Sequence, residues 1–436
     1  MRRGAALDTE YPGCHGKYQC VEKKRVAGGT DPTAGLINVS GVLYGVAFNG
    51  GGLDIEACTF RGWACGTVFK LTTSGKFTVL HRFGNLPDGY GPMGRLTNVD
   101  GTLYGTTEAG GGGQCKLNNT VTTGCGTVFE VSTSGLESVI YRFKGQPDGL
   151  FPTAGLTRLG TALYGTTSGG GAKCSGCGTV FKVTTSGKET VLHSFKATAQ
   201  SPSGKSDGAS PAAGLAYANG KLYGTTEYGG GSNEGTVFAI TTSGNESVLH
   251  SFAGGPADGE KPDSALIKVN GTFYGTTSLG GTYNLGTVFA IAPSGKVTIL
   301  HSFNGSGDGS RPTAGLVDVG DTLYGTTQEG SPNQAGTAFA ITTSGAYELL
   351  HCFYSSVDGG EPRGDLIDVD GRLFGTTSEG GPSDSDGSSD GTVFSLTTDG
   401  EATLVHAFGG PPRLRPSSTA CRPDRPFTGA IKEASS

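Results

Sequence analysis

A motif that recurs seven times is the feature that most constrains the fold of this chain. Each copy follows the skeleton P-x-A-G-L, L-Y-G-T-T, G-T-V-F-x-I-T-T-S-G, V-L-H-S-F and D-G, with local substitutions. The aromatic residue of the second segment marks the period, at Tyr44, Tyr104, Tyr164, Tyr223, Tyr274, Tyr324 and Phe374. The markers are 50 to 60 residues apart. Self-similarity at such a period indicates a solenoid or a propeller, in which each copy is one supersecondary unit.

Each copy contains four short segments with the composition of β-strands. In the fifth copy they are residues 265–269, 272–276, 287–291 and 297–303. Pairs such as Asn270-Gly271 separate the first two segments, and Ser-Gly pairs separate the last two, as tight hairpin turns require. Glycine supplies 79 of the 436 residues, far above the usual share of about 7%. Each copy is therefore predicted to be an antiparallel four-stranded meander.

A single meander of this kind cannot bury both of its faces. In the strand at 178–183, Val180 points to one side while Phe181 and Val183 point to the other. Stacking of neighbouring copies buries these faces, and closure into a ring removes the exposed ends. We therefore predict an all-β fold, a seven-bladed β-propeller with four antiparallel strands per blade. An open β-solenoid is the alternative, although its repeats are usually shorter.

The repeats also divide the chain. Residues 31–408 are predicted to form the propeller, residues 1–30 a poorly ordered lead-in, and the Pro/Arg/Ser-rich residues 409–436 a disordered tail. No apolar run approaches the roughly 20 residues of a membrane-spanning helix, and no signal peptide is visible at the N-terminus. A net charge of −6 without a basic stripe argues against a nucleic acid partner. We expect a monomer.

The skeleton G-x-L-Y-G-T-T-x-x-G-G…G-T-V-F…T-V-L-H-S-F resembles the GloVer tandem repeat of bacterial exported and surface-anchored proteins. It is more distantly similar to kelch repeats, whose strand ending in a Gly doublet is matched by Leu222-Tyr223…Gly229-Gly230. The departures are Val46-Ala47 for Thr-Thr, Ile140-Tyr141 for Leu-His and Ser331-Pro332 for Gly-Gly. The resemblance implies the fold and an extracellular or cell-surface location, and it implies no activity.

The loops fall on two sides of the predicted ring. Turns between the first and second strands, and between the third and fourth, lie on one side and are short in every copy. Loops between the second and third strands, and connections to the next copy, lie on the other side, here called the loop face. All differences in length between copies fall on the loop face. Binding usually resides in variable loops on a fixed scaffold, so we predict binding there, with the long loops of the first three blades involved.

Five residues of the loop face are candidates for contact with a ligand. Trp63 is the only tryptophan and lies in a loop, where it would stack on a sugar ring or anchor a protein partner, or else pack beneath its own loop. Tyr228 and Tyr283 lie in later loops. Glu108 and Glu227 follow the second strands of their copies.

These features predict a secreted or surface propeller that binds a carbohydrate or protein ligand through the loop face, without catalysis. No nucleophile elbow, zinc-protease helix or phosphate-binding loop occurs in the sequence, and no catalytic residue is predicted. One alternative is an extracellular carbohydrate-active enzyme, of the lyase or glycosidase type, with an acid and a base from different blades. The other is a purely structural surface module.

Three pairs of cysteines bracket loop insertions at the same point of consecutive copies. The pairs are Cys58 with Cys65, Cys115 with Cys125, and Cys174 with Cys177. We predict a disulfide within each loop, which suits an oxidising compartment. Zinc would need a second pair of ligands nearby, and free thiols are the remaining alternative. Cys352 and Cys421 have no evident partner.

One histidine and one aspartate recur at fixed positions of the repeat. The histidines are His81, His193, His250, His301, His351 and His406, with Tyr141 in the second copy; the aspartates are Asp88, Asp148, Asp207, Asp258, Asp308 and Asp358. Residues present in nearly every blade indicate architecture. We expect the imidazoles to form hydrogen bonds within or between blades and the aspartates to cap turns. A ring of imidazoles that chelates a metal is the alternative.

A loop of the last copy departs from the repeat and offers three carboxylates. Asp384, Asp386 and Asp390 surround Gly387, and hard cations take several oxygen ligands from one tight turn. The loop lacks the length and the bidentate Glu of an EF-hand. Calcium is therefore a weak prediction against a solvated loop, and no other cofactor is predicted.

Overall fold

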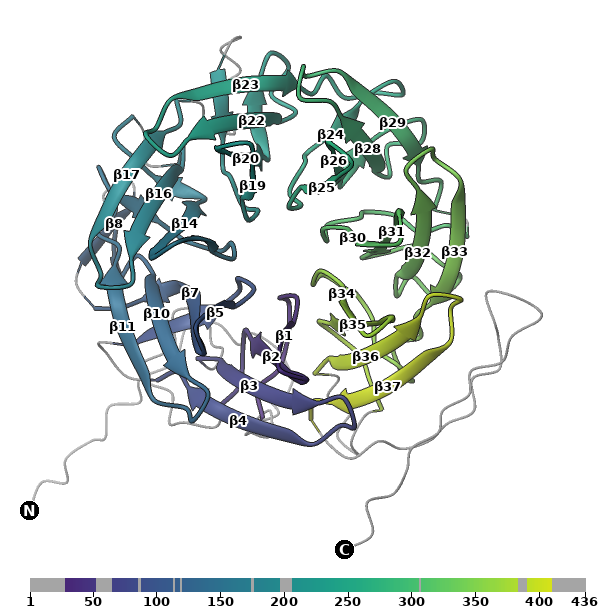
Figure 1. Cartoon of the computed structure of the whole chain (residues 1–436), viewed down its shortest axis with the longest axis horizontal. Coiled ribbons are helices and arrows are strands. Elements are labelled where there is room, and N and C mark those ends of the chain that lie inside the picture. Colours follow the sequence, from purple (N-terminus) through teal and green to yellow (C-terminus); the bar gives the residue numbers. More distant parts are fainter. Residues whose placement is uncertain are drawn as a thin grey trace, which may run out of the picture.

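The fold was analysed in a computed structural model, which describes residues 28–51, 65–84, 88–112, 114–117, 120–173, 176–196, 206–305, 307–382 and 390–409. They form a closed ring of seven sheets around a central axis, and no helix occurs among them (Figure 1). The predicted seven-bladed propeller with four antiparallel strands per blade is confirmed. The predicted lead-in and tail lie almost entirely outside the described residues.

Each blade is formed by one repeat, and its strands run in chain order from the axis to the rim. Blade 1 consists of β1 (Ile37–Val39), β2 (Val42–Ala47), β3 (Thr67–Thr72) and β4 (Phe77–Arg82). Blade 2 consists of β6 (Thr97–Val99), β7 (Thr102–Gly110), β10 (Thr127–Ser132) and β11 (Glu137–Arg142). Blade 3 consists of β13 (Thr157–Leu159), β14 (Ala162–Thr167), β16 (Thr179–Thr184) and β17 (Glu189–Ser194).

The later blades repeat the pattern. Blade 4 consists of β19 (Ala216–Ala218), β20 (Lys221–Thr226), β22 (Thr236–Thr241) and β23 (Glu246–Ser251). Blade 5 consists of β25 (Ile267–Val269), β26 (Thr272–Thr277), β28 (Thr287–Ile291) and β29 (Val297–Ser302). Blade 6 consists of β30 (Val317–Val319), β31 (Thr322–Thr327), β32 (Thr337–Thr342) and β33 (Tyr347–Cys352). Blade 7 consists of β34 (Ile367–Val369), β35 (Arg372–Thr377), β36 (Thr392–Thr397) and β37 (Ala402–Ala407).

Short additional strands lie on the loop face. Segments of the connections between blades pair with the ends of second strands or with the loops that follow them. These strands are β5 (Gly89–Pro92) on β7, β12 (Gly149–Leu150) on β15 (Gly169–Gly170), β18 (Ser206–Ala209) on β21 (Tyr228–Gly230), and β24 (Gly259–Glu260) on β27 (Leu279–Gly280). The insertion in blade 2 adds the hairpin of β8 (Gln114–Leu117) and β9 (Thr120–Thr123).

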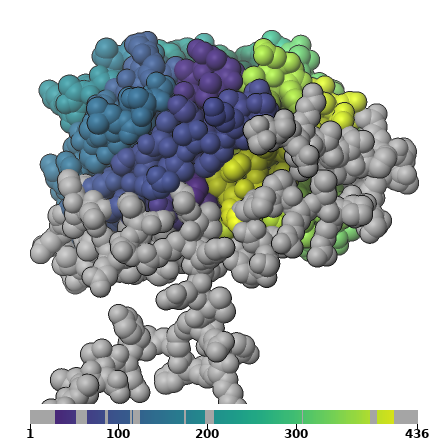
Figure 2. Space-filling model, turned by 90° about the horizontal axis from the view of Figure 1, so that it is seen from below, coloured from purple at the N-terminus to yellow at the C-terminus, as the bar shows by residue number. Residues whose placement is uncertain are grey.

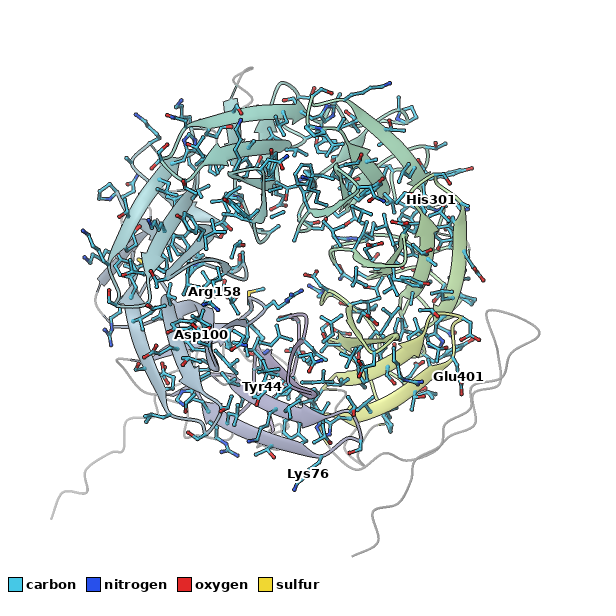
Figure 3. The ribbon with its side chains drawn as sticks, in the orientation of Figure 1. Tyr44, Lys76, Asp100, Arg158, His301 and Glu401 are labelled. Carbon is cyan, nitrogen blue, oxygen red and sulfur yellow. A yellow bond between two sulfur atoms is a disulfide. The ribbon has the colours of Figure 1, made fainter. Side chains whose placement is uncertain are left out.

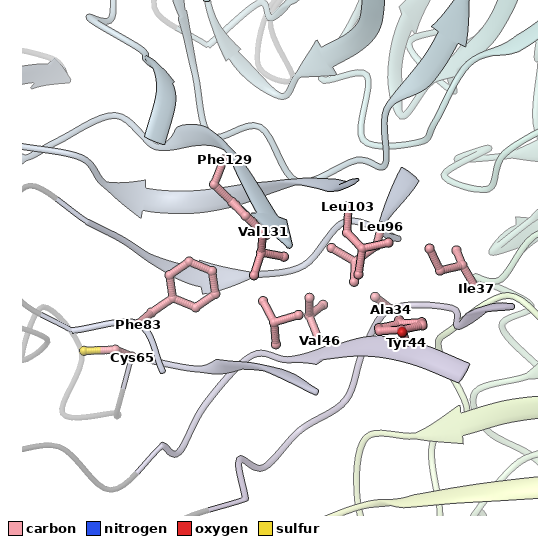
Figure 4. Close-up of a cluster of buried hydrophobic side chains, with 11 residues drawn as sticks. Ala34, Ile37, Tyr44, Val46, Cys65, Phe83, Leu96, Leu103, Phe129 and Val131 are labelled. Carbon is pink, nitrogen blue, oxygen red and sulfur yellow. The ribbon is translucent and has the colours of Figure 1, made fainter. Parts of the chain in front are cut away.

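Aromatic side chains hold each blade against the next. Phe83, which follows the last strand of blade 1, packs edge-on against Phe129 of blade 2, with ring centroids 5.1 Å apart. Both rings belong to a buried cluster that also contains Val46 and Leu103 (Figure 4). Equivalent edge-on pairs form in later blades, including Phe195 with Phe238. The apolar faces that one meander cannot bury are thus buried between blades, as the pattern of the strands predicted.

The ring closes between blades 7 and 1 by packing and loop contacts, because all four strands of each blade come from a single repeat. Figure 2 shows the purple and blue surface of blade 1 against the yellow surface of blade 7. Phe69 and Phe374 lie in one buried cluster across this seam. The Thr376 hydroxyl donates a hydrogen bond to the Ala34 carbonyl, at 3.0 Å. Among the described residues, no strand is therefore exchanged to lock the ring.

In five of the seven blades, the recurring histidine and aspartate form a hydrogen-bonded pair. The imidazole Nε2 on the fourth strand lies 2.6 to 3.2 Å from a carboxylate oxygen, at His81–Asp88, His193–Asp207, His250–Asp258, His301–Asp308 and His351–Asp358. In blade 2 the Tyr141 hydroxyl donates to Asp148 at 2.8 Å. The imidazoles lie at the rim, as His301 does in Figure 3, so they form no inward ring. The architectural interpretation explains both recurring residues.

The seam between blades 7 and 1 lacks this pair. The Gly28 carbonyl accepts a hydrogen bond from Thr67 at 3.2 Å, as the Asp308 carbonyl does from Thr337 at 3.3 Å. Gly28 therefore occupies the place of the aspartate. His406 stacks on the Phe77 ring, with centroids 4.2 Å apart, and burial lowers its pKa to about 4.

A Gly28→Asp substitution is expected to stabilise the ring. A Cβ atom at Gly28 would lie 3.4 Å from the nearest Phe77 atom, which is ordinary contact, and the carboxylate would accept from His406, adding about 1 kcal/mol. The folded pKa of His406 lies below its unfolded value of about 6.5. The wild type therefore loses stability as pH falls through about 6.5 towards 4, and the variant is expected to lose less. Urea denaturation at about pH 5 and about pH 8 measures both effects, and a variant indistinguishable from Gly28→Ala at both values contradicts the assignment.

Candidate ligand-binding site

A tunnel of about 880 Å³ occupies the axis of the ring. Its wall is formed by the P-x-A-G-L segment and the first strand of the blades, the innermost elements in Figure 1. Each segment enters from the loop face, so the residue that follows the proline lies towards that end. This position holds Thr33, Met93, Thr153, Ala212, Asp263, Thr313 and Arg363, and all seven line the tunnel. The repeat thus places one variable side chain per blade around the wall.

Four of these seven residues carry an oxygen without a partner. The hydroxyl oxygens of Thr33, Thr153 and Thr313 and the Oδ1 atom of Asp263 are closed off from solvent and have no hydrogen-bond partner in the described part of the chain. Buried polar atoms of native proteins are normally paired with protein, water or ligand. Polar capacity that the fold does not use is therefore concentrated at this ring of positions.

Charged residues break the repeat at three of the blades. Arg95 and Asp365 stand where four other copies have Gly, and Asp263 stands where three copies have Thr. Asp365 is held in place because its Oδ1 atom accepts a hydrogen bond from the Gly315 amide at 2.6 Å. Arg363 pairs with Glu361 at 2.8 Å. The tunnel wall therefore carries fixed charges of both signs.

Between blades 4 and 5, Glu227, Tyr228, Lys261 and Asp263 form what we call the 4/5 cluster. The Lys261 ammonium lies 4.1 Å from the centroid of the Tyr228 ring. Burial, followed by the charge of Glu227, raises the pKa of Asp263 to about 7, although Arg311 opposes the shift. Burial and Glu227 also raise the pKa of Tyr228, whereas Lys261 lowers it. The cluster therefore sets the Asp263 carboxyl near the Glu227 carboxylate, and the Lys261 ammonium against the Tyr228 ring.

The backbone that presents Lys261 has an unusual conformation. Lys261 directly precedes Pro262 and has φ of 54°, in the left-handed region that residues with a Cβ rarely adopt. Its amide donates to the Glu234 carbonyl at 2.9 Å, and its carbonyl accepts from the Ser278 amide at 3.1 Å. These bonds to the two neighbouring loops hold the residue in place. The same conformation recurs before the proline at Asp31, Phe151, Ser210, Arg311 and Glu361.

The structure brings two of the five predicted contact residues, Glu227 and Tyr228, into the 4/5 cluster. Tyr283 lies in the loop of blade 5 and is 60% exposed, and Glu108 lies on β7 of blade 2. Trp63 lies outside the described residues, so its role stays a prediction.

Of the predicted calcium ligands, Asp384 and Asp386 also lie outside the described residues. Asp390 is buried, and its carbonyl accepts a hydrogen bond from the Asp31 amide at 3.1 Å. This residue therefore contributes to the contact between blades 7 and 1, and a calcium site in its loop stays a prediction.

Sequence reasoning missed Asp263 and Lys261. The signal was available, because Pro262-Asp263-Ser264-Ala265-Leu266 replaces the usual P-T-A-G-L. Loop length predicted binding at the first three blades. The 4/5 cluster instead arises from single substitutions in copies of ordinary length.

Disulfides brace the loop face. Cys115 and Cys125 are joined, with Cα atoms 5.1 Å apart. Cys65 and Cys177 are also disulfide-bonded, and their predicted partners Cys58 and Cys174 lie outside the described residues. Cys352 is disulfide-bonded as well, although the sequence showed no evident partner for it.

Comparison with known proteins identifies the repeat. The family model described as the Gloeobacter/Verrucomicrobia repeat matches residues 64–271 and 247–434, which together cover most of the chain. The chain belongs to the Gloeobacter/Verrucomicrobia repeat family. The GloVer resemblance is thereby confirmed. In the described part of this family member, no helix is long and apolar enough to span a membrane.

The other comparisons add little about this member of the Gloeobacter/Verrucomicrobia repeat family. No curated protein matches its sequence. Among solved structures, a gluconolactonase from Xanthomonas campestris is similar at 16% identity and a TM-score of 0.34, over 54% of this chain and 69% of that chain. Similarity at this level supports no conclusion about activity.

Proposed function

We propose that this protein binds a carbohydrate, without catalysis, at the loop-face end of its central tunnel. The single observation that carries the proposal is Asp263, a carboxyl that lines the tunnel where three other copies have Thr and that lies near Glu227 of the neighbouring blade. Carboxylates accept hydrogen bonds from sugar hydroxyls, and an ammonium donates to them. We also propose an extracellular or surface location, since disulfides persist in oxidising compartments.

The dimensions of the tunnel favour a small polar ligand over a protein partner. Its volume of about 880 Å³ falls within the range of about 300–1,000 Å³ that small-molecule sites occupy. A stable protein partner would need about 800 Å² of surface on each side, which the tunnel wall does not offer.

The test is a calorimetric and glycan-array screen of mono- and oligosaccharides with wild type and Asp263→Thr. Threonine is the residue that Thr33, Thr153 and Thr313 place at this position, so the variant restores the repeat and is expected to fold. Loss of the carboxylate is expected to weaken the bound sugar at least about tenfold, or about 1.4 kcal/mol. Asp100→Asn is the matched control, because Asp100 lies in the β6–β7 turn on the opposite face. Binding that Asp263→Thr leaves unchanged, or that Asp100→Asn weakens equally, contradicts the proposal.

A second candidate function is carbohydrate hydrolysis or elimination at the same place. It is favoured by the pKa of Asp263, which burial and Glu227 raise to about 7, because a carboxyl that keeps its proton beside a second carboxylate is the arrangement of an acid–base pair. Product analysis on every sugar that binds separates the two functions. Turnover that Asp263→Thr lowers by about 100-fold or more establishes an enzyme, and binding without product establishes the binding protein.

A further inference from the structure

We propose that the rim of the propeller holds two sites for a divalent transition-metal ion, each built where two blades meet. The first is formed by His81, Asp88 and Glu137, and the second by His193, Asp207 and Glu246. In each, one ligand atom of every side chain lies within 4.8 Å of the other two. Among the described residues, no other group of three His, Cys, Asp or Glu side chains has its ligand atoms this close together. The proposal is independent of the tunnel and of the carbohydrate.

The carboxylate of the third side chain is an addition to the scaffold. The hydrogen bond between the histidine and the aspartate also forms in blades that have no third ligand. The glutamate comes from the next blade, where it is the first residue of the fourth strand, β11 or β23. In β17 this residue is also a glutamate, Glu189. In the other four blades it is Phe77, Val297, Tyr347 or Ala402. Tyr347 stacks on His301 with ring centroids 4.0 Å apart. The fold therefore accepts apolar and aromatic side chains here and does not require a carboxylate.

Each glutamate brings a carboxyl oxygen that the protein leaves without a hydrogen-bond partner. The Oε1 atoms of Glu137 and Glu246 are closed off from solvent and have no hydrogen-bond partner in the described residues. Asp88 is itself held by its backbone, because its Oδ1 atom accepts from the Gly89 amide at 2.8 Å and its Oδ2 atom from the Gly84 amide at 3.2 Å. Two partly buried carboxyl groups beside one imidazole are costly unless a cation joins them. A metal ion bound to all three side chains supplies that charge.

The ligand set indicates the class of metal. One imidazole nitrogen and two carboxylate oxygens suit Zn²⁺, which takes four ligands and accepts water as the fourth. Calcium requires six to eight oxygens. The Lys196 ammonium lies 3.5 Å from Asp207 and competes with a cation at the second site.

The junction of blades 2 and 3 provides a natural control within the chain. There the Tyr141 hydroxyl donates to Asp148 at 2.8 Å, and Glu189 Oε1 is again closed off and without a partner. A phenol takes the place of the imidazole and removes the neutral nitrogen ligand. We expect no metal at this junction, which makes Glu189→Gln the matched control for Glu137→Gln.

The experiment titrates the chelator-treated full chain, without a histidine tag, with ZnCl₂ at neutral pH and follows heat and melting temperature. The wild type is expected to bind two Zn²⁺ at these sites and to melt at higher temperature as Zn²⁺ increases. Glu137→Gln is expected to lower the affinity for one of the two Zn²⁺ ions by roughly tenfold or more. The double variant Glu137→Gln/Glu246→Gln is expected to lower the affinity for both ions. Glu189→Gln is expected to retain both.

Three results would overturn the proposal. The first is a double variant that binds as many Zn²⁺ ions as the wild type. The second is a Glu189→Gln variant that loses as much Zn²⁺ binding as Glu137→Gln. The third is a wild type that binds no Zn²⁺ up to about 1 mM, a concentration that corresponds to a binding free energy of only about −4 kcal/mol. If Glu137→Gln does not fold, His81→Tyr replaces it, because tyrosine already fills this place in blade 2. The His81→Tyr variant is expected to bind one Zn²⁺ ion fewer, and its metal-free form is expected to melt cooperatively. If lower pH stabilises the wild type and Zn²⁺ does not, the carboxyl groups share a proton instead of binding a metal ion.

Discussion

Asp358→Ala is expected to lower the free energy of unfolding by about 3 kcal/mol. The Asp358 side chain is 3% exposed and accepts hydrogen bonds from His351 Nε2 at 2.6 Å and from the Tyr354 amide at 2.7 Å. Each buried donor left without a partner costs about 1–3 kcal/mol, and alanine leaves both donors unpaired. Calorimetry or urea denaturation followed by circular dichroism measures the loss.

The control is Asp368→Ala, which removes an aspartate from β34 of the next blade. Asp368 is exposed, and its Oδ1 atom accepts from the Gly371 amide at 2.9 Å, a bond that water replaces at a cost expected to be below about 1 kcal/mol. If the two variants lose similar stability, the recurring His–Asp pair is not a structural element of the ring.

The repeat made the average blade predictable, because hydrophobic alternation and turn residues act within one copy. The number of blades, the antiparallel meander and the structural role of the histidines all follow from positions that recur. In the fifth copy, the segment expected at 287–291 is β28 itself, and the first strand is shorter than expected, beginning at Ile267. The residues before Ile267 line the tunnel as the P-x-A-G-L segment.

What a single copy does in contact with its neighbours was not predictable in the same way. Gly28 replaces an aspartate whose partner, His406, lies 378 positions later in the chain, and only closure of the ring brings them to one seam. The same holds for Glu227 and Asp263, which belong to different blades and interact at the junction of blades 4 and 5. Departures from the repeat were visible in the sequence, but their meaning depends on which faces of which blades they share.

The glycine of the L-Y-G-T-T segment provides the second large expected effect, since its role is a close approach between strands. A Cβ atom at Gly325 would lie 2.6 Å from Phe339 Cζ and 2.7 Å from Leu316 Cδ2. The equivalent glycines of the other six blades meet the same two side chains of their own copies, at Gly45, Gly105, Gly165, Gly224, Gly275 and Gly375. Extra volume in a packed core costs about 1–3 kcal/mol, and the two contacts place Gly325→Ala at about 3 kcal/mol.

Two further variants separate this packing effect from a general effect of replacing glycine. Gly307→Ala is the control, because a Cβ atom there meets nothing within 4 Å, and its change is expected to stay within about 0.5 kcal/mol. Gly325→Ala combined with Phe339→Leu is expected to lose less than the sum of the single changes, because the smaller side chain makes room for the new methyl group. Strict additivity would place the cost of Gly325→Ala in the backbone and not against Phe339.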